Sequence, residues 1–199
     1  MSHFMNLAKM GYVPTPSLVV ERVAAFLRAD GACHLLDPCA GAGEALAQLG
    51  GLLGHGTTFG IELDVNRSAA AEVVLHQVLG GSYEHALLSK GAEGAELLWL
   101  NPPYSTDTKA GRRLELTFLR ETQDWLRPGG VLIYIVRQAH LSGHVARRLS
   151  TWFEDLSIYR FPGQEYDAYQ QVVVFGLKRE SAVEDNEACL HVLSAAKTR

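Results

Sequence analysis

The chain alternates short apolar runs with longer segments in which apolar residues recur at helical spacing. An unbroken apolar run of about four to eight residues is typical of a buried strand, whereas apolar residues three or four positions apart indicate one face of a helix. The runs predict strands at Cys33–Asp37, Thr57–Ile61, Tyr83–Leu88, Ala95–Leu100, Val131–Val136, Leu156–Phe161 and Gln171–Leu177. The periodic segments predict helices at Val19–Arg28, Glu44–Leu53, Val65–Leu79, Arg112–Leu126 and His140–Phe153.

This alternation of strands and helices indicates an α/β domain, in which helices cover both faces of a parallel sheet. The last two strands break the alternation, because residues 162–169 are too few for a crossover helix, so the last strand should insert antiparallel. We therefore predict a seven-stranded, mostly parallel sheet with an antiparallel last strand, within one domain that spans residues 1–180. Residues 181–199 should form a short helix or a tail.

Composition narrows the classes of function. The formal net charge of −4 argues against tight, sequence-independent binding of nucleic acid by this chain alone, because phosphate contacts need clustered lysine and arginine. Cys33, Cys39 and Cys189 lack the spacing of metal ligands and suggest a reducing cytoplasm. Cys33 and Cys39 flank a predicted buried strand and are expected to be core thiols. No apolar run approaches the roughly 20 residues that span a bilayer. We expect a cytoplasmic protein without a metal or a membrane partner.

Two of the predicted strands end in residues suited to ligand binding. The first leads into Asp37-Pro38-Cys39-Ala40-Gly41-Ala42-Gly43, where small residues let a ligand approach the backbone at the start of a helix. This is not the dinucleotide fingerprint, because Leu46 stands where that motif needs glycine. Asp37 would repel a pyrophosphate but could bind an ammonium group. Glu62, at the end of the second strand, is placed to bind ribose hydroxyls.

The fourth strand ends in Asn101-Pro102-Pro103-Tyr104, where two prolines fix the backbone at a rigid corner. Amide and carbonyl oxygens could accept hydrogen bonds from an amino group, and the tyrosine ring offers a face for stacking. A proline-rich turn without a chemical role is the alternative for this motif taken alone. Because the carboxyl ends of parallel strands share one edge of a sheet, all three motifs should face one ligand site.

Together the motifs resemble those of class I S-adenosylmethionine-dependent methyltransferases, in particular the adenine-N6 amino-methyltransferases with gamma-class motif order. In that order a Thr-Pro motif precedes the glycine motif, as Tyr12-Val13-Pro14-Thr15-Pro16 does here. The resemblance covers about residues 11–177 and implies a Rossmann-like methyltransferase fold, S-adenosylmethionine as cofactor and a nucleic acid, DNA or RNA, as partner. It implies cofactor contacts from Thr15, Pro16, Asp37, Cys39, Ala40, Gly41, Gly43, Glu62, Leu63 and Asn101.

The same resemblance implies a catalytic corner formed by Asn101, Pro102, Pro103 and Tyr104. Asn101 and the Pro102 carbonyl would accept hydrogen bonds from the substrate amine, and Tyr104 would stack on the base. Positioning and electrostatics can then carry the transfer without a strong general base. Further substrate contacts are expected from Tyr104, Arg112, Arg113 and Tyr166, the last of which should be exposed beside Glu165 and Asp167.

Two departures from the family pattern leave alternatives open. The family usually has an aspartate after the third strand that contacts the cofactor's adenine, and this position falls near His85, with Ser82 and Glu84 close by. The chain also has no room for a target-recognition domain, so another chain, a separate domain or the shape of the substrate would supply recognition. An RNA base, a protein glutamine side chain, and a cofactor-binding subunit without catalysis remain alternatives; Thr15 and Pro16 favour a nucleic acid.

Overall fold

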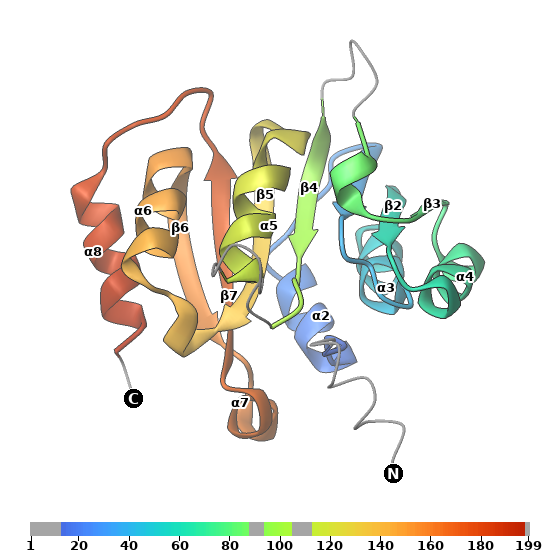
Figure 1. The fold of residues 1–199 in the computed structure, drawn as a ribbon, viewed down its shortest axis with the longest axis horizontal. Helices are drawn as coiled ribbons and strands as arrows, with labels where there is room; N and C mark the ends of the chain where they lie inside the picture. The colour runs from blue at the N-terminus through green and yellow to red at the C-terminus, as the bar shows by residue number, and fades with distance from the viewer. Residues whose placement is uncertain (1–12, 88–93, 105–112, 198–199) are drawn as a thin grey trace.

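The computed structural model describes residues 13–87, 94–104 and 113–197 (Figure 1). Within these ranges, seven strands form one sheet in the order β3-β2-β1-β4-β5-β7-β6. Only β7 runs antiparallel to its neighbours β5 and β6, which confirms the predicted mostly parallel sheet and its antiparallel last strand. The strands are β1 (Cys33–Asp37), β2 (Gly56–Glu62), β3 (Gln77–Gly80), β4 (Ala95–Leu100), β5 (Leu126–Arg137), β6 (Phe153–Arg160) and β7 (Gln171–Lys178).

Helices cover both faces of this sheet (Figure 1). One face packs against α2 (Ser17–Ala24), α3 (Glu44–Leu53) and α4 (Val65–Val74), and the other against α5 (Leu114–Thr122), α6 (Gly143–Trp152) and α8 (Asn186–Ala195). Side chains alternate along each strand, so Trp99 packs in the core between the sheet and α2, α3 and α4. Leu98 packs in the core between the sheet and α5, α6 and α8. The short helix α7 (Gly163–Tyr169) connects β6 to β7, and 3₁₀ turns occupy Tyr83–His85, Gln123–Trp125 and Gln138–His140.

The third strand lies earlier in the chain than the sequence suggested. The predicted helix to Leu79 and the predicted strand at 83–88 are both wrong, because α4 stops at Val74 and β3 begins at Gln77. His76 explains the difference: its backbone N–H donates to Thr58 Oγ1 at 3.1 Å, and its Nδ1 accepts from the Thr58 N–H at 3.2 Å. These contacts fix the chain beside β2, and a helix could not continue through them.

The topology places the three motifs at one edge of the sheet. Asp37 and Glu62 end β1 and β2, and Asn101 directly follows β4, which pairs with β1 through Leu36 and Leu98. In the described part of the chain, no helix is long and apolar enough to span a membrane.

Candidate active site

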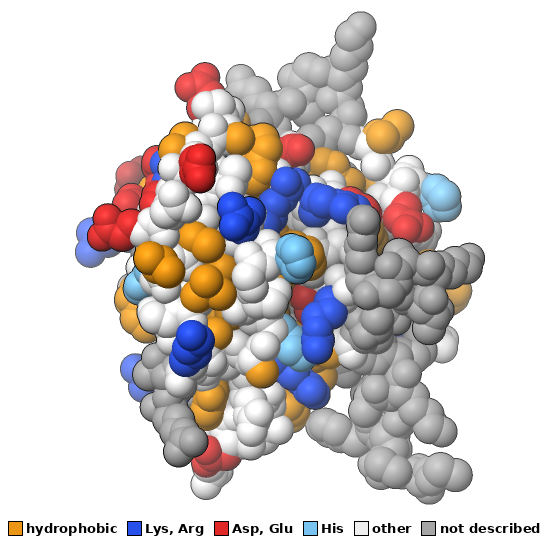
Figure 2. All heavy atoms as spheres, turned by 60° about the vertical axis from the view of Figure 1, so that its left-hand side comes forward, with side chains coloured by type: hydrophobic (Ala, Val, Ile, Leu, Met, Phe, Trp, Pro, Cys, Tyr) orange, Lys and Arg blue, Asp and Glu red, His pale blue; other side chains and the backbone are white. Residues whose placement is uncertain are grey.

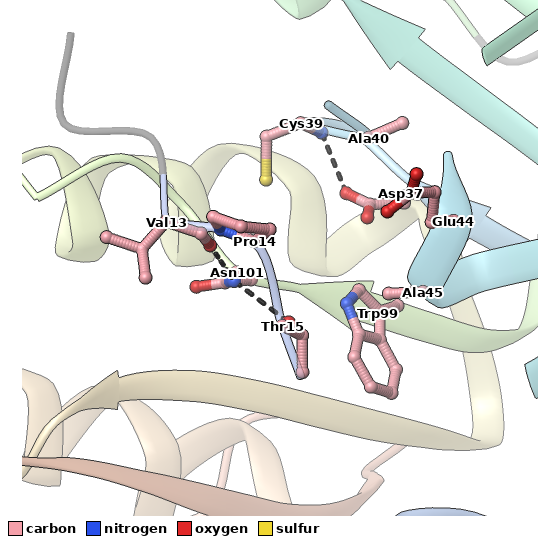
Figure 3. A pocket seen from close by; sticks show the side chains of 10 residues that line it. All are labelled: Val13, Pro14, Thr15, Asp37, Cys39, Ala40, Glu44, Ala45, Trp99 and Asn101. Atoms are coloured by element: carbon pink, nitrogen blue, oxygen red, sulfur yellow. Dashed lines mark hydrogen bonds between the residues drawn. The ribbon is translucent and has the colours of Figure 1, made fainter. Parts of the chain in front are cut away.

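The side chain of Asn101 has a fixed orientation (Figure 3). Its Nδ2 donates to the Val13 carbonyl at 2.9 Å and to Thr15 Oγ1 at 3.0 Å. Both amide hydrogens are therefore used by the segment that leads into α2. The amide oxygen accepts a hydrogen bond from the Tyr104 hydroxyl at 2.9 Å, so it is this acceptor that faces the corner.

Tyr104 is held by contacts from β5, β7 and the turn after β5. Its hydroxyl also accepts a hydrogen bond from Gln171 Nε2. The Arg137 guanidinium lies 5.4 Å from the centre of the ring, and the ring of His140 meets it edge-on at 6.4 Å. Burial raises the pKa of Tyr104 above its ordinary value, so the hydroxyl stays protonated and donates to Asn101.

A first hollow, the Asp37 hollow, opens between the end of β1 and the segment before α2 (Figure 3). Asp37 is only 3 % exposed, and its Oδ1 accepts from the Cys39 N–H at 2.9 Å. Burial raises the pKa of Asp37 to about 7, despite this hydrogen bond. The lining residues are Val13, Pro14, Thr15, Asp37, Cys39, Ala40, Glu44, Ala45, Trp99 and Asn101.

A second hollow, the Glu62 hollow, lies beside the first. Cys39 and Asn101 line both, so the two hollows adjoin at the end of β4. Leu63 is 68 % exposed and offers an apolar surface next to the Glu62 carboxylate. The second hollow is lined by Pro38, Cys39, Glu62, Leu63, Arg67, Gly81, Ser82, Tyr83, Glu84, Asn101, Pro103, Leu114 and Phe118.

The Glu62 carboxylate connects the glycine turn to the end of β2. Its Oε2 accepts from the Gly41 N–H at 2.8 Å, and its Oε1 accepts from the Asp64 N–H at 2.8 Å. Arg67 adds a charged contact, since its guanidinium donates to Oε1 at 2.7 Å. Arg67 lies on the ordinary helix α4, and nothing in the sequence around it signals this pairing.

Other predicted residues lie behind the hollows or outside the described ranges. Pro16, Gly41 and Gly43 line neither hollow: Pro16 precedes α2, and the two glycines form the turn into α3 with positive φ angles of 58° and 80°. His85 is exposed and lies outside both hollows, whereas Ser82 and Glu84 line the second. Arg112 is not among the described residues.

Tyr166 differs from the sequence-based expectation. It is half-buried rather than exposed, because its hydroxyl donates to Gln138 Oε1 and the Arg160 guanidinium lies 5.0 Å from its ring centre. Its ring also packs at the margin of the core under α2 and α3. A contact of Tyr166 with a substrate stays a prediction.

Beside the corner, a buried hydrogen bond joins α5 to the turn before α6. Glu115, with a side chain 1 % exposed, accepts from His140 Nδ1 at 2.7 Å. His140 Nε2 lies 2.6 Å from the Arg113 guanidinium, which can only donate, so the neutral ring carries its proton on Nδ1. Glu115 and His140 were missed because each is an ordinary polar position in its own segment, and only the fold brings them together.

The described residues contain no group of histidine, cysteine and acidic side chains arranged to hold a metal. Burial raises the pKa of Cys39 well above its ordinary value, which makes it a neutral thiol between the two hollows. All three cysteines are free thiols.

The sheet order and the two hollows at its carboxyl edge define a Rossmann-like methyltransferase fold. Residues 1–196 match the model of a family described as "Uncharacterised methyltransferase family (DUF6094)". The chain belongs to this methyltransferase family. A search of curated proteins found no match.

Solved structures share the fold at low sequence identity. A candidate class I S-adenosylmethionine-dependent methyltransferase from Listeria monocytogenes superposes with a TM-score of 0.73 at 15% identity, over 94% of this chain and 72% of that one. The modification subunit of a candidate type I restriction enzyme from Vibrio vulnificus gives 0.62 at 16% identity, over 84% and 45%. A tRNA (m1A58) methyltransferase from Aquifex aeolicus gives 0.61 at 14% identity, over 85% and 71%.

Proposed function

We propose that this protein transfers a methyl group from S-adenosylmethionine to an exocyclic amino group of a nucleic-acid base, namely N6 of adenine in DNA. Membership of a methyltransferase family supports the reaction type. The Asn-Pro-Pro-Tyr corner and the preceding Thr-Pro segment support the amino-group target, since this motif order resembles that of adenine-N6 enzymes.

The observation that carries the proposal is the orientation of Asn101. Val13 and Thr15 engage its amide nitrogen, and Tyr104 donates one hydrogen bond to its oxygen, so the second lone pair of that oxygen is the acceptor left for a ligand at the corner. An aryl amine has two hydrogens and a delocalised lone pair. Acceptors at Asn101 Oδ1 and the Pro102 carbonyl would bind those hydrogens and turn the lone pair towards the methyl donor.

The chemistry of the two hollows fits S-adenosylmethionine. The buried Asp37 carboxylate suits the ammonium group of the methionine moiety, with Thr15 and Glu44 on the same wall. In the second hollow, Glu62 would accept from the ribose hydroxyls and Leu63 would cover the adenine ring. When bound, the cofactor would supply a sulfonium methyl group to the amine nitrogen; S-adenosylhomocysteine would be the leaving group, and the amine would release one proton to solvent.

Ser82 and Glu84 are better placed than His85 to contact the cofactor's adenine amino group. Both line the second hollow, and Ser82 Oγ lies 3.3 Å from the Glu84 carboxylate. Either oxygen could accept the hydrogen bond that an aspartate provides in the enzymes that this chain resembles.

The substrate class is tested with S-adenosylmethionine that carries a tritiated methyl group. The protein is incubated separately with DNA, RNA and a protein extract, and label should enter DNA. Label confined to RNA would move the target to another nucleic acid, and label confined to protein would support glutamine methylation and contradict the proposal.

The cofactor assignment is tested by calorimetry with S-adenosylhomocysteine. If this compound does not bind at millimolar concentration, the cofactor assignment is overturned.

The role of Asn101 is tested by Asn101→Ala with Thr15→Val as the matched control. The alanine variant removes the acceptor, so transfer should fall by about 10²–10³-fold while calorimetry still detects S-adenosylhomocysteine. Thr15→Val removes one of the two groups that orient the amide and should reduce transfer by about tenfold or less. Transfer by Asn101→Ala at the wild-type rate would show that the corner is only structural.

A further inference from the structure

A groove runs between α5 and α6 on the face opposite to α2 and α3, and one end of it lies beside the catalytic corner. Its lining includes Arg113 and His140 at that end, and the His140 ring meets the Tyr104 ring at 6.4 Å. Further from the corner, Arg120 on α5 faces residues of α6. The α6 side contributes His144, Arg147, Arg148 and Trp152.

Positive charge concentrates in this groove although the whole chain has a net charge of −4. Figure 2 shows Lys or Arg and His side chains along a band down the middle of one face. Two acidic side chains offset part of this charge: Glu115 is buried against His140, and Glu121 pairs with Arg120 at 3.0 Å. Asp124 pairs with Lys178 at 2.9 Å.

The arginines on α6 are presented for a ligand. Arg147 is exposed on the helix surface. The Arg148 guanidinium lies 5.4 Å from the Trp152 ring centre and donates to the Arg120 carbonyl at 3.3 Å, but its buried Nε has no hydrogen-bond partner among the described residues. A guanidinium has five donors in a planar fork that matches phosphate oxygens.

We propose that the groove binds the phosphate backbone of the DNA strand that carries the target base. This inference rests on the proposed function and adds to it the surface that holds the substrate. A strand of phosphates satisfies several arginines at once, and its course from Trp152 towards His140 delivers a base to Asn101 and Tyr104. The groove would hold DNA through its backbone, without reading the base sequence.

The test is fluorescence anisotropy of a labelled single-stranded DNA oligonucleotide, measured with saturating S-adenosylhomocysteine over a series of salt concentrations. Arg120→Glu and Arg147→Glu are combined in one variant, and Arg22→Glu with Arg28→Glu is the control. The control changes the net charge by the same amount as the groove variant. Its two arginines are exposed and lie on α2 and just after it, on the opposite face of the sheet. All variants should have the same melting temperature as the wild-type protein. The single Arg147→Gln variant provides a milder change if the double variant does not fold.

The groove variant should bind at least about tenfold more weakly, and its slope of log Kd against log salt should fall by about 1.4, or about 0.7 for each lost contact with a single strand. The control should bind as the wild type does. Equal affinity and slope for the groove variant and the control would overturn the proposal, as would tighter binding of an RNA of the same sequence. Failure of methyl transfer with intact binding in the groove would instead contradict the proposed function alone.

Discussion

At the scale of single residues, the sequence identified the groups of the corner but not their orientation. Asn101 followed from its position after an apolar strand, whereas the direction of its amide depends on Val13 and Thr15, which lie 88 and 86 residues earlier in the chain. Glu115 and His140 left no local signal, because their pairing at 2.7 Å exists only once α5 packs beside the turn before α6. Long-range polar contacts of this kind have no sequence period.

Tyr104 has two separable roles, a hydroxyl that holds Asn101 Oδ1 and a ring for stacking. Tyr104→Phe keeps the ring and loses the hydrogen bonds to Asn101 and Gln171, so we expect transfer to fall by about tenfold. Tyr104→Ala should lose at least a further tenfold, since a stacked base contributes about 1–3 kcal/mol. Single-turnover rates measure both steps. Equal rates for the two variants would contradict stacking by Tyr104.

Asp37 should make cofactor binding depend on pH. Because the pKa of Asp37 is about 7 in the folded protein, its carboxyl group is mostly protonated below pH 7 and must lose that proton to bind a cationic ammonium group. The affinity for S-adenosylhomocysteine should therefore fall by about tenfold for each pH unit below 7. Calorimetry from pH 5 to pH 8 measures this, and Asp37→Asn should bind weakly with no such dependence. Wild-type affinity in the asparagine variant would remove Asp37 from the site.

The buried Asp37 carboxylate should also lower the stability of the cofactor-free protein at high pH. Because the folded pKa is raised above its unfolded value of about 3.8, stability is present at low pH and is lost as pH rises through 7. The stability advantage of Asp37→Asn over the wild type should therefore be larger at pH 8 than at pH 5. This advantage, measured as the difference in free energy of unfolding, should grow by up to about 3 kcal/mol between the two pH values. Urea denaturation at the two pH values gives the comparison.

At the scale of elements, periodicity predicted the sheet and most helices, and it failed where a tertiary contact overrides a local preference. The segment 65–79 is compatible with one long helix, yet the contacts of His76 with Thr58 end α4 at Val74 and start β3. By contrast, the antiparallel β7 was predictable, because the short connection of residues 162–169 allows few other arrangements. The length of the connection constrained the direction of β7, and no comparable constraint acts on residues 65–80.

The two ends of α3 offer a matched test of the glycine turn. Gly43 and Gly54 flank this helix with φ angles of 80° and 78°, so alanine at either position incurs a similar backbone penalty of about 1–2 kcal/mol. At Gly43 a Cβ would also lie 2.9 Å from Leu75, whereas nothing lies within 4 Å at Gly54. Gly43→Ala should thus destabilise the protein by about 1 kcal/mol or more beyond Gly54→Ala in urea denaturation. Equal losses of stability in the two variants would mean that the Leu75 side chain moves aside without an energetic penalty.

At the scale of the whole molecule, the sheet separates the two proposed tasks, methyl transfer and DNA binding. The carboxyl edge brings Asp37, Glu62 and Asn101 around two adjoining hollows, and the face formed by α5 and α6 carries the basic groove. The edge was predictable, since parallel strands direct their carboxyl ends to one side. The groove was not, because its arginines come from two helices that are each unremarkable in charge.

The most direct test of the central claim is nucleoside analysis of DNA after incubation with S-adenosylmethionine. The wild-type protein should produce N6-methyldeoxyadenosine, and Asn101→Ala should produce almost none while it still binds S-adenosylhomocysteine. A methyl group on a ring nitrogen, a carbon or an oxygen, or equal product from Asn101→Ala, would contradict an amino-group clamp at this corner.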